Sequence, residues 1–518
     1  MPWLSELFYD HGWLTRMPLR ILRVRCAYGS RKGGRRVFMS RSGVYVAFTD
    51  RTARPRHAAF SRPATEEEEP RRSHRHGALT IHPLSTHWKR VLFALLTLAT
   101  GCSSGARDFD PTANASQAVS DHNRHRWEAK HCNEDAIESV TRTDYLLPFK
   151  SNLTSPNNQG QAYLDIRVVK PVYKNNLDAA AYGSQCTPRG VVVAVHGRTF
   201  DSVSSFDVQY KDYSLAEGLA KRGITTYLFS ILGNGFSSRF SMDNPCNYSE
   251  ADQTASLVPN PLSATCNPTD PFVFSSTDAV VSQLRAAVDH AISETGVSAV
   301  SLFAWSRGGF FAGPYAQRNP AKVKNMIFYA GNYTFRRAGV RVPDNPPPLP
   351  VAGIPGGVSS RLVALDNAWG SQISAACPGQ RDPGIADALW KSQKERDPLG
   401  ASWGSGGVVR IPNITLWGWN QKNAVHVTTP ILILSGLLDR SVPTAWEQQL
   451  YDDVAGTKKV LIKMACASHY ALWEGSTLWG GPHTIIQRAT ADWVIGEAFD
   501  GTSHGIFSVS ATGAISPE

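Results

Sequence analysis

The feature that most constrains the fold is an alternation of strand-like and helix-like segments through most of the chain. Short apolar or β-branched runs predict strands at 162–169, 191–195, 224–231, 297–305, 323–330, 430–436 and 458–464. Apolar residues at helical spacing predict helices at 215–222, 278–295, 308–318, 445–454 and 484–499. Strands that alternate with helices form right-handed βαβ units. The predicted fold class is therefore α/β, with a mostly parallel central sheet flanked by helices.

The alternation stops between residues 333 and 428, a stretch with a proline-rich run at 346–350, many glycines and five tryptophans. We expect residues 131–332 and 429–500 to form the α/β core. An insertion between two strands of such a sheet suits a cap or lid over the site, and a packed surface excursion without function is the alternative. Residues 501–518 are expected to be a C-terminal tail.

The first 130 residues do not share this pattern. Residues 1–90 hold 18 Lys and Arg against 7 Asp and Glu, whereas the net charge of the whole chain is +10. The rest of the chain is therefore close to neutral, and nucleic acid is not expected as a partner. Residues 1–86 show no sustained period, so we expect them to be disordered or to be an extension from a start codon placed too far upstream.

Residues 87–102 have the parts of a secretory signal: a basic start, a ten-residue apolar run at 91–100, and small residues after it. The apolar run is too short to span a bilayer as a helix. The ending Ala99-Thr100-Gly101-Cys102 resembles a bacterial lipobox, which implies export and a lipid on Cys102. Membrane attachment would then depend on that lipid, with 103–130 as a tether; without it the protein would be periplasmic or secreted. A basic tail before a chance apolar run is the alternative.

Export affects the interpretation of the cysteines. Apart from Cys26 and Cys102, six remain: Cys132, Cys186, Cys246, Cys266, Cys377 and Cys466. An even number in an oxidising compartment favours disulfides, although six cysteines allow fifteen pairings. Cys246 and Cys266 bracket one Pro/Asn-rich loop and are the first pair that we expect. Free buried thiols are the alternative, and no CxxC pair indicates a metal site.

Two serines lie in the small-x-Ser-x-small pattern of a nucleophile on a tight strand-to-helix turn. Gly101-Cys102-Ser103-Ser104-Gly105 matches literally but has no predicted strand before it. Ala304-Trp305-Ser306-Arg307-Gly308 follows the strand at 297–305 and opens the next helix. This context selects Ser306 as the nucleophile.

With these motifs the chain resembles the α/β-hydrolase superfamily over 191–499, and an exported, lipoprotein esterase-like branch of it. Val195-His196-Gly197-Arg198 is similar to the family's His-Gly step after a strand. The resemblance implies an oxyanion hole made by the backbone amide of Arg198 or Thr199 together with that of Arg307. We leave open whether the two arginine side chains bind an acidic group, and solvent exposure is the simpler expectation.

The family's order of nucleophile, acid and histidine assigns the rest of the triad. Gly436-Leu437-Leu438-Asp439 ends the strand at 430–436 and looks like the family's acid turn. Ala467-Ser468-His469-Tyr470 follows the next strand and is similar to its histidine loop. The Asp usual before the Gly233–Ser237 turn is Ser230 here.

The predicted function is cleavage of small-molecule carboxylic esters by a serine hydrolase with Ser306, Asp439 and His469, no cofactor and no metal. An exported aminopeptidase is one alternative, and it would need cap acids to hold an amine; Asp366, Asp382, Asp387 and Glu395 are candidates. A non-catalytic binding protein on the same fold is the other. A dehalogenase or epoxide hydrolase would need Asp in place of Ser306.

Overall fold

The computed structural model describes residues 38–40, 43–45, 134–174, 188–337 and 340–518. The chain divides into two units, Met1–Phe109 and Asp110–Glu518. In the first unit, β1 (Phe38–Ser40) pairs antiparallel with β2 (Gly43–Tyr45). The predicted signal at 87–102, the lipid site Cys102, the tether at 103–130, Cys132 and Cys186 lie outside the described residues.

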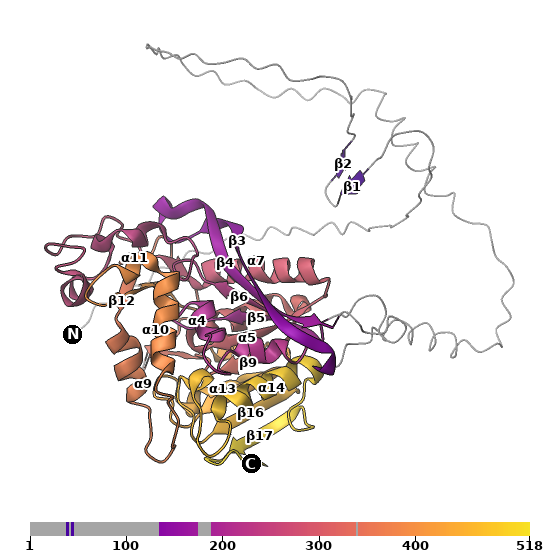
Figure 1. Ribbon diagram of the computed structural model, residues 1–518. Helices are drawn as coiled ribbons and strands as arrows, with labels where there is room; N and C mark the ends of the chain where they lie inside the picture. Colours follow the sequence, from indigo (N-terminus) through magenta and orange to yellow (C-terminus); the bar gives the residue numbers. More distant parts are fainter. Residues whose placement is uncertain (1–37, 41–42, 46–133, 175–187, 338–339) are drawn as a thin grey trace, which may run out of the picture. The chain divides into compact units, whose positions relative to one another are not determined.

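The second unit is built on a ten-stranded sheet of order β18-β17-β16-β15-β9-β8-β5-β6-β4-β3 (Figure 1). Neighbouring strands from β17 to β6 in this order run parallel, and the three outer pairings β17–β18, β4–β6 and β3–β4 are antiparallel. The ten strands are β3 (Ile137–Asn152), β4 (Gln159–Tyr173), β5 (Gly190–Val195), β6 (Ile224–Ser230), β8 (Val300–Trp305), β9 (Val323–Tyr329), β15 (Ile431–Gly436), β16 (Lys459–Met464), β17 (His504–Val509) and β18 (Ile515–Pro517).

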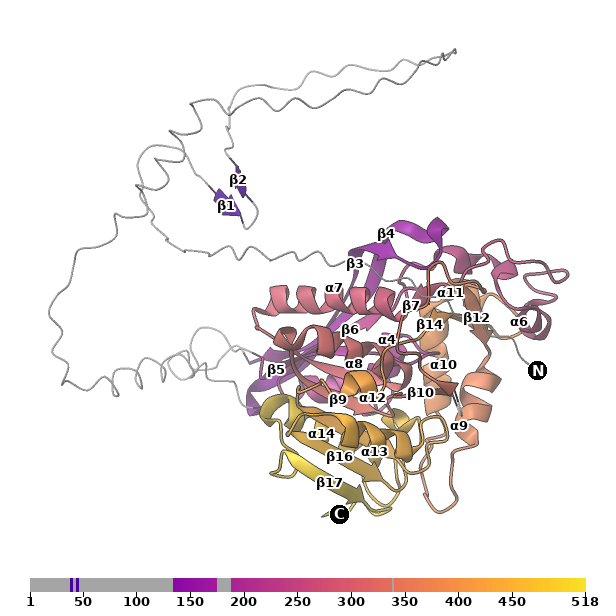
Figure 2. The ribbon, with the colours of Figure 1, turned by 180° about the vertical axis from the view of Figure 1, so that it is seen from behind.

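Helices cover both faces of this sheet (Figures 1 and 2). In β5, Val191, Val193 and Val195 pack in one apolar core with α7, α8 and α13, whereas Val192 and Ala194 pack in a second core with α4, α5 and α14. This division follows from the two-residue period of a strand. The helices are α4 (Ser202–Phe206), α5 (Leu215–Ala220), α6 (Glu250–Asp252), α7 (Thr277–Thr295), α8 (Gly309–Arg318), α9 (Ala368–Gly370), α10 (Ile385–Arg396), α11 (Pro398–Ala401), α12 (Gln421–Ala424), α13 (Thr444–Asp453) and α14 (Pro482–Gly496).

The predicted fold class is confirmed, and the predicted strands and helices are present with bounds that shift by a few residues. Two regions differ from the expectations. The strand predicted at 162–169 is the middle of β4, which forms a long hairpin with β3, a strand that we did not predict. Residues 501–518 are not a simple tail, because β17 pairs with β16 and β18 with β17 at the end of the sheet.

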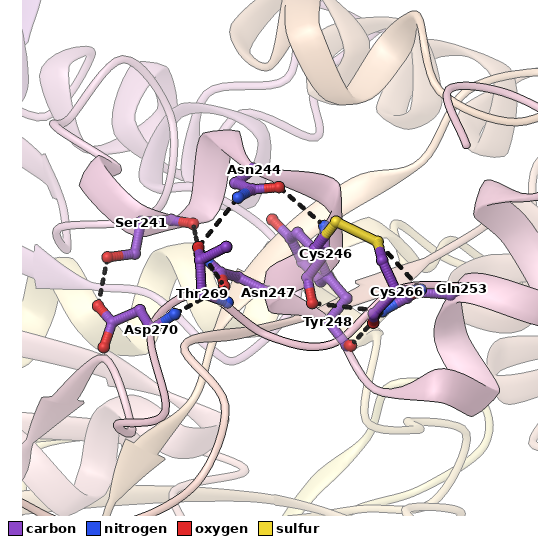
Figure 3. The surroundings of a disulfide bond; sticks show 9 residues. All are labelled: Ser241, Asn244, Cys246, Asn247, Tyr248, Gln253, Cys266, Thr269 and Asp270. Carbon is purple, nitrogen blue, oxygen red and sulfur yellow. Dashed lines mark hydrogen bonds between the residues drawn. A yellow bond between two sulfur atoms is a disulfide. The ribbon is translucent and has the colours of Figure 1, made fainter. Parts of the chain in front are cut away.

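A long excursion separates β6 from α7, and a disulfide joins Cys246 to Cys266 within it, as expected (Figure 3). Gln253 accepts a hydrogen bond from the Cys266 amide at 2.8 Å, and Asn247 accepts from the Asp270 amide at 3.0 Å. The buried side chains of Gln253 and Asn247 thus give the loop fixed internal contacts. β7 (Ser275–Ser276) follows it and pairs parallel with β14 (Ile414–Thr415).

The segment between β9 and β15 contributes no strand to the ten-stranded sheet within the described residues. Its helices α10 and α11 lie beside the excursion after β6, whereas α12 packs against α8 (Figures 1 and 2). Besides β14, its short strands are β10 (Phe335–Arg337), β11 (Val340–Arg341), β12 (Gly356–Ser359) and β13 (Val409–Pro412). Ile385, Leu389 and Trp390 of α10 join the core that contains α4 and α5. Its role as a lid stays a prediction.

Among the described residues, no helix is both long enough and apolar enough to cross a membrane.

Candidate active site

Ser306 lies on a sharp turn between β8 and α8. Its φ of 55° falls in the left-handed region that non-glycine residues rarely adopt. Gly308 and Gly309 are needed because the backbone is crowded: a Cβ on Gly308 would lie 2.4 Å from the Val195 carbonyl oxygen, and one on Gly309 would lie 2.7 Å from that of Asn332. The turn therefore has the geometry of a nucleophile elbow. Ala304, which stands where the pattern has its first glycine, lies within β8.

The three predicted triad side chains follow β8, β15 and β16 and meet at the carboxyl ends of these parallel strands. His469 Nε2 lies 2.8 Å from Ser306 Oγ, and His469 Nδ1 lies 2.8 Å from Asp439 Oδ2. Because a carboxylate only accepts hydrogen bonds, the proton of the neutral imidazole is assigned to Nδ1. Nε2 is then free to accept the hydroxyl proton of Ser306.

Asp439 is held by the backbone that follows it. Its Oδ1 accepts hydrogen bonds from the amides of Ser441 and Val442, at 2.7 and 2.8 Å. Its side chain has no exposed area. One carboxylate oxygen thus fixes the turn while the other faces His469.

The histidine loop is attached to the nucleophile strand and to the next strand. Trp305 Nε1 donates to the His469 carbonyl oxygen at 3.0 Å, and the Trp305 ring lies 5.6 Å from the imidazole, centroid to centroid. Tyr329 at the end of β9 donates its hydroxyl proton to the Ser468 carbonyl oxygen. These two aromatic residues read as ordinary strand residues in the sequence, so their contacts with the loop were not predicted.

The predicted oxyanion loop lies against the nucleophile. A Cβ on Gly197 would be 3.1 Å from Ser306 Cβ, and the amides of Arg198 and Thr199 follow directly. His196 anchors the loop, since its Nδ1 lies 2.9 Å from the Gly197 carbonyl oxygen and its Nε2 accepts from the Ile231 amide at 3.0 Å. Burial lowers the pKa of His196 to about 3, so this histidine stays neutral.

The side chain of Arg307 is buried, contrary to the simpler expectation of solvent exposure, whereas Arg198 is exposed. Its guanidinium faces the carbonyl oxygens of Arg198 and Pro412, each at 3.4 Å. Burial and the nearby Arg198 lower the pKa of Arg307 to about 9. The Arg307 guanidinium thus contacts the carbonyl oxygen of the peptide group that joins Arg198 to Thr199. The N–H of that peptide group is the Thr199 amide.

The other histidines after Ser306 are not its hydrogen-bond partners. His483 contacts the Glu474 carbonyl oxygen at 2.7 Å, His504 lies on β17, and His426 is exposed. Asn332 follows β9, where an acid is absent from the sequence. It donates its amide to the Ser306 carbonyl oxygen at 2.9 Å, and its Nδ2 lies 3.4 Å from Ser306 Oγ.

A carboxylate from another strand lies opposite Ser230 and contacts the turn that follows. Asp165 of β4 accepts a hydrogen bond from the Phe236 amide at 3.0 Å, within the Gly233–Ser237 turn. Spacing along the sequence does not indicate this contact, because β4 and the turn meet only through strand pairing.

An open cleft of about 780 Å³ lies between the excursion after β6 and the segment between β9 and β15. Asn260, Arg361 and Trp390 are among its lining residues, and none of the three triad residues is. No group of three or more His, Cys, Asp or Glu residues suited to a metal ion occurs in the part of the chain that the structure describes.

A mostly parallel sheet with a serine elbow, an acid turn and a histidine loop at its carboxyl edge defines the class of α/β hydrolases. The sequence matches the family described as alpha/beta hydrolase fold over residues 190–476, more than half of the chain. The chain belongs to this family and is a hydrolase of that fold.

Solved structures match the chain at low identity. A monoacylglycerol lipase of Paleococcus ferrophilus is 21% identical, with a TM-score of 0.34, over 60% of this chain and 96% of its own. A thermophilic esterase of Thermogutta terrifontis is 13% identical, with a TM-score of 0.37, over 67% and 97%. Est1E of Butyrivibrio proteoclasticus is 14% identical, with a TM-score of 0.32, over 64% and 93%. No curated protein matches the chain.

Proposed function

We propose that this protein is a serine hydrolase that cleaves carboxylic esters through an acyl-enzyme on Ser306. The single observation that carries the proposal is the hydrogen-bonded series from Asp439 through His469 to Ser306, with both distances at 2.8 Å. Serine is a weak nucleophile until a positioned base takes its proton, and this series supplies the base and the group that orients it.

The chemistry proceeds in two halves. Ser306 Oγ attacks the ester carbonyl carbon while its proton passes to His469 Nε2. The imidazolium then gives that proton to the leaving alkoxide, the carbon–oxygen bond breaks, and an alcohol departs. Water loses a proton to His469, attacks the acyl carbon and releases the acid as Ser306 recovers its proton. Asp439 keeps the imidazole in the productive tautomer and stabilises its charged form.

The amide of Arg307 and that of Arg198 or Thr199 would stabilise the negative oxygen of each tetrahedral intermediate. The contact of Gly197 with Ser306 supports this assignment, because it puts the loop directly beside the nucleophile.

Four acidic residues between β9 and β15 could hold the amine of an aminopeptidase substrate, but each lies beside a cationic side chain. This favours an ester substrate. Asp366 lies 3.2 Å from Arg381, Asp387 lies 2.5 Å from Arg361, and Asp382 contacts Lys211. Glu395 lies 3.9 Å from Lys391 on the same helix. An acid that holds a substrate amine needs a free carboxylate, and each of these four already has a cation beside it.

Labelling with a fluorophosphonate probe tests the proposal. Wild-type protein should be labelled, Ser306→Ala should not, and Ser103→Ala is the matched control because Ser103 occupies the literal Gly-x-Ser-x-Gly match. Hydrolysis of p-nitrophenyl acyl esters without hydrolysis of aminoacyl anilides is expected. Wild-type protein that neither reacts with the probe nor cleaves esters would indicate the non-catalytic alternative.

We also propose that the protein is exported and carries a lipid on Cys102. The lipobox-like ending supports it, and the two disulfides Cys246–Cys266 and Cys377–Cys466 are typical of an oxidising compartment. Metabolic labelling with a fatty-acid analogue should mark the wild-type protein and not Cys102→Ala. Equal labelling of both variants would contradict the proposal.

A further inference from the structure

We propose that Gln372 is a positioning residue for the reaction, which holds the acid turn and the histidine loop together from the segment between β9 and β15. The inference rests on the proposed function. Gln372 Oε1 accepts two hydrogen bonds, from the backbone amide of His469 and from that of Arg440, each at 3.1 Å. Arg440 directly follows Asp439, so one oxygen atom contacts the backbone of the base and of the residue after the acid.

The orientation of the Gln372 amide is determined by its partners. Its Nε2 donates to the Ala368 carbonyl oxygen at 3.1 Å, which requires the nitrogen on that side. A flipped amide would point an NH₂ group at two backbone N–H groups. The side chain is also buried, with 4% of its area exposed. Water therefore does not readily replace Oε1 as the acceptor, and an unpaired buried N–H is costly.

A rigid environment holds Gln372 in place. Gln380 donates to the Gln372 carbonyl oxygen at 3.3 Å and to Glu474 at 3.0 Å. Glu474 in turn accepts from the Ser468 amide at 2.8 Å, from the Ser468 hydroxyl at 2.5 Å, and from Trp369 Nε1 at 2.7 Å. The residue next to the catalytic histidine and two residues of the intervening segment thus share one buried carboxylate.

A disulfide joins the same two segments as these hydrogen bonds. The disulfide Cys377–Cys466 connects the Gln372-bearing turn to the start of the histidine loop. Trp369 also stacks on Tyr470, with ring centroids 5.4 Å apart. The intervening segment and the histidine loop are therefore one structural unit, and Gln372 extends that unit to the acid turn.

The expected effect is on catalysis more than on substrate binding. Without the Gln372 oxygen, the acid turn and the histidine loop lose their common acceptor, and the separation of Asp439 from His469 is less tightly determined. A displacement of a catalytic group by about 1 Å can cost about 100-fold in rate. Gln372 is buried and its side-chain polar atoms are already hydrogen-bonded within the protein, so KM should change little.

Three variants test the proposal. Gln372→Met has a similar size and no acceptor, Gln372→Glu keeps an accepting oxygen, and Gln421→Met is the control because Gln421 is exposed. The kinetic parameters kcat and KM are measured with a p-nitrophenyl ester. The value of kcat is normalised to the active sites titrated with a fluorophosphonate, so that loss of folded protein does not count as loss of rate.

Gln372→Met should lower kcat about 10- to 100-fold with KM within about twofold. Gln372→Glu keeps an accepting oxygen and should recover most of kcat, measured across a pH–rate profile. Gln421→Met should match wild type.

A wild-type kcat in Gln372→Met overturns the positioning role while the proposed function stands. If Gln372→Met does not fold, the Gln372→Glu variant decides. A kcat for Gln372→Glu that is 10-fold or more below wild type at every pH of the pH–rate profile also overturns the positioning role. Wild-type protein without Ser306-dependent labelling overturns both.

Discussion

At the scale of single residues, the site depends on carboxylates whose environments differ. Asp439 has two amide donors on one oxygen and His469 on the other. Glu474 is also fully buried, and it accepts from the side chains of Trp369, Gln380 and Ser468 and from the Ser468 amide. In the proposed reaction the two acids have separate tasks: Asp439 orients the imidazole, and Glu474 holds the loop that carries it.

Asp439→Asn tests the first task. The amide preserves the shape of the side chain but places a donor or a weaker acceptor against His469 Nδ1, which favours the wrong tautomer. We expect kcat to fall by about 10⁴ with KM nearly unchanged. Steady-state kinetics check this, with Asp452→Asn at an exposed position as the control. A loss of less than about tenfold would argue against Asp439 as the triad acid.

Glu474 predicts a pH dependence of stability. Burial raises the pKa of this carboxyl from its usual value to about 7. Between the unfolded value and about pH 7 the folded state binds the proton and the unfolded state does not, so stability falls as pH rises through that window. Glu474→Gln should show a smaller decrease of Tm from pH 5 to pH 8 than wild type. Parallel Tm curves for the two proteins would contradict this assignment.

At the scale of elements, the two described disulfides have different consequences. Cys246–Cys266 closes a loop within the excursion after β6, with a sequence separation of 20. Cys377–Cys466 joins the intervening segment to the loop of His469, with a separation of 89. In the chain-entropy model the longer loop contributes about 4.5 kcal/mol to the free energy of unfolding and the shorter loop about 3 kcal/mol.

Two double variants separate stability from catalysis. Cys377→Ala/Cys466→Ala should lower both the free energy of unfolding and kcat per titrated site, because the bridge begins the histidine loop. Cys246→Ala/Cys266→Ala is the matched control, which should lower stability and leave kcat per site close to wild type. Urea unfolding and active-site titration measure the two quantities. Equal kcat for both double variants would contradict the link between the bridge and the loop.

At the scale of the whole molecule, buried ion pairs attach the intervening segment to the core. Arg396 at the end of α10 contacts Asp165 of β4, and its Nε lies 3.1 Å from Asp201 at the start of α4. All three side chains are nearly fully buried. Because their charges are paired across the boundary, separating the segment from the sheet would leave unpaired charges behind.

Arg396→Met tests the strength of this attachment. Removal of one partner of a buried ion pair typically costs about 3–5 kcal/mol, since the remaining carboxylates lose their compensation. Lys391→Met on the same helix is the control, because the Lys391 side chain is 77% exposed. Urea unfolding should show a large decrease for Arg396→Met and little change for Lys391→Met. Similar midpoints would mean that the charges are solvated rather than paired.

The sequence alone predicted what depends on short stretches of chain. Apolar periodicity located the parallel strands and their helices, and the serine after a strand and before a helix identified Ser306. The order of motifs then selected Asp439 and His469, which the structure brings within hydrogen-bonding distance. β17 and β18 were missed because residues 501–518 form two short strands that are recognised only by their pairing with β16 and with each other.

Only the tertiary structure decided which distant residues support the site. Gln372 and the partner of Cys466 carry no local signal, because the sequence does not distinguish a buried glutamine from an exposed one. Their roles arise when segments about 100 residues apart pack together and backbone amides must find acceptors. The burial of Arg307 and the contact of Asp165 with the turn after Ser230 have the same origin. Local periodicity encodes the elements, whereas the contacts among buried polar groups are set by how those elements meet.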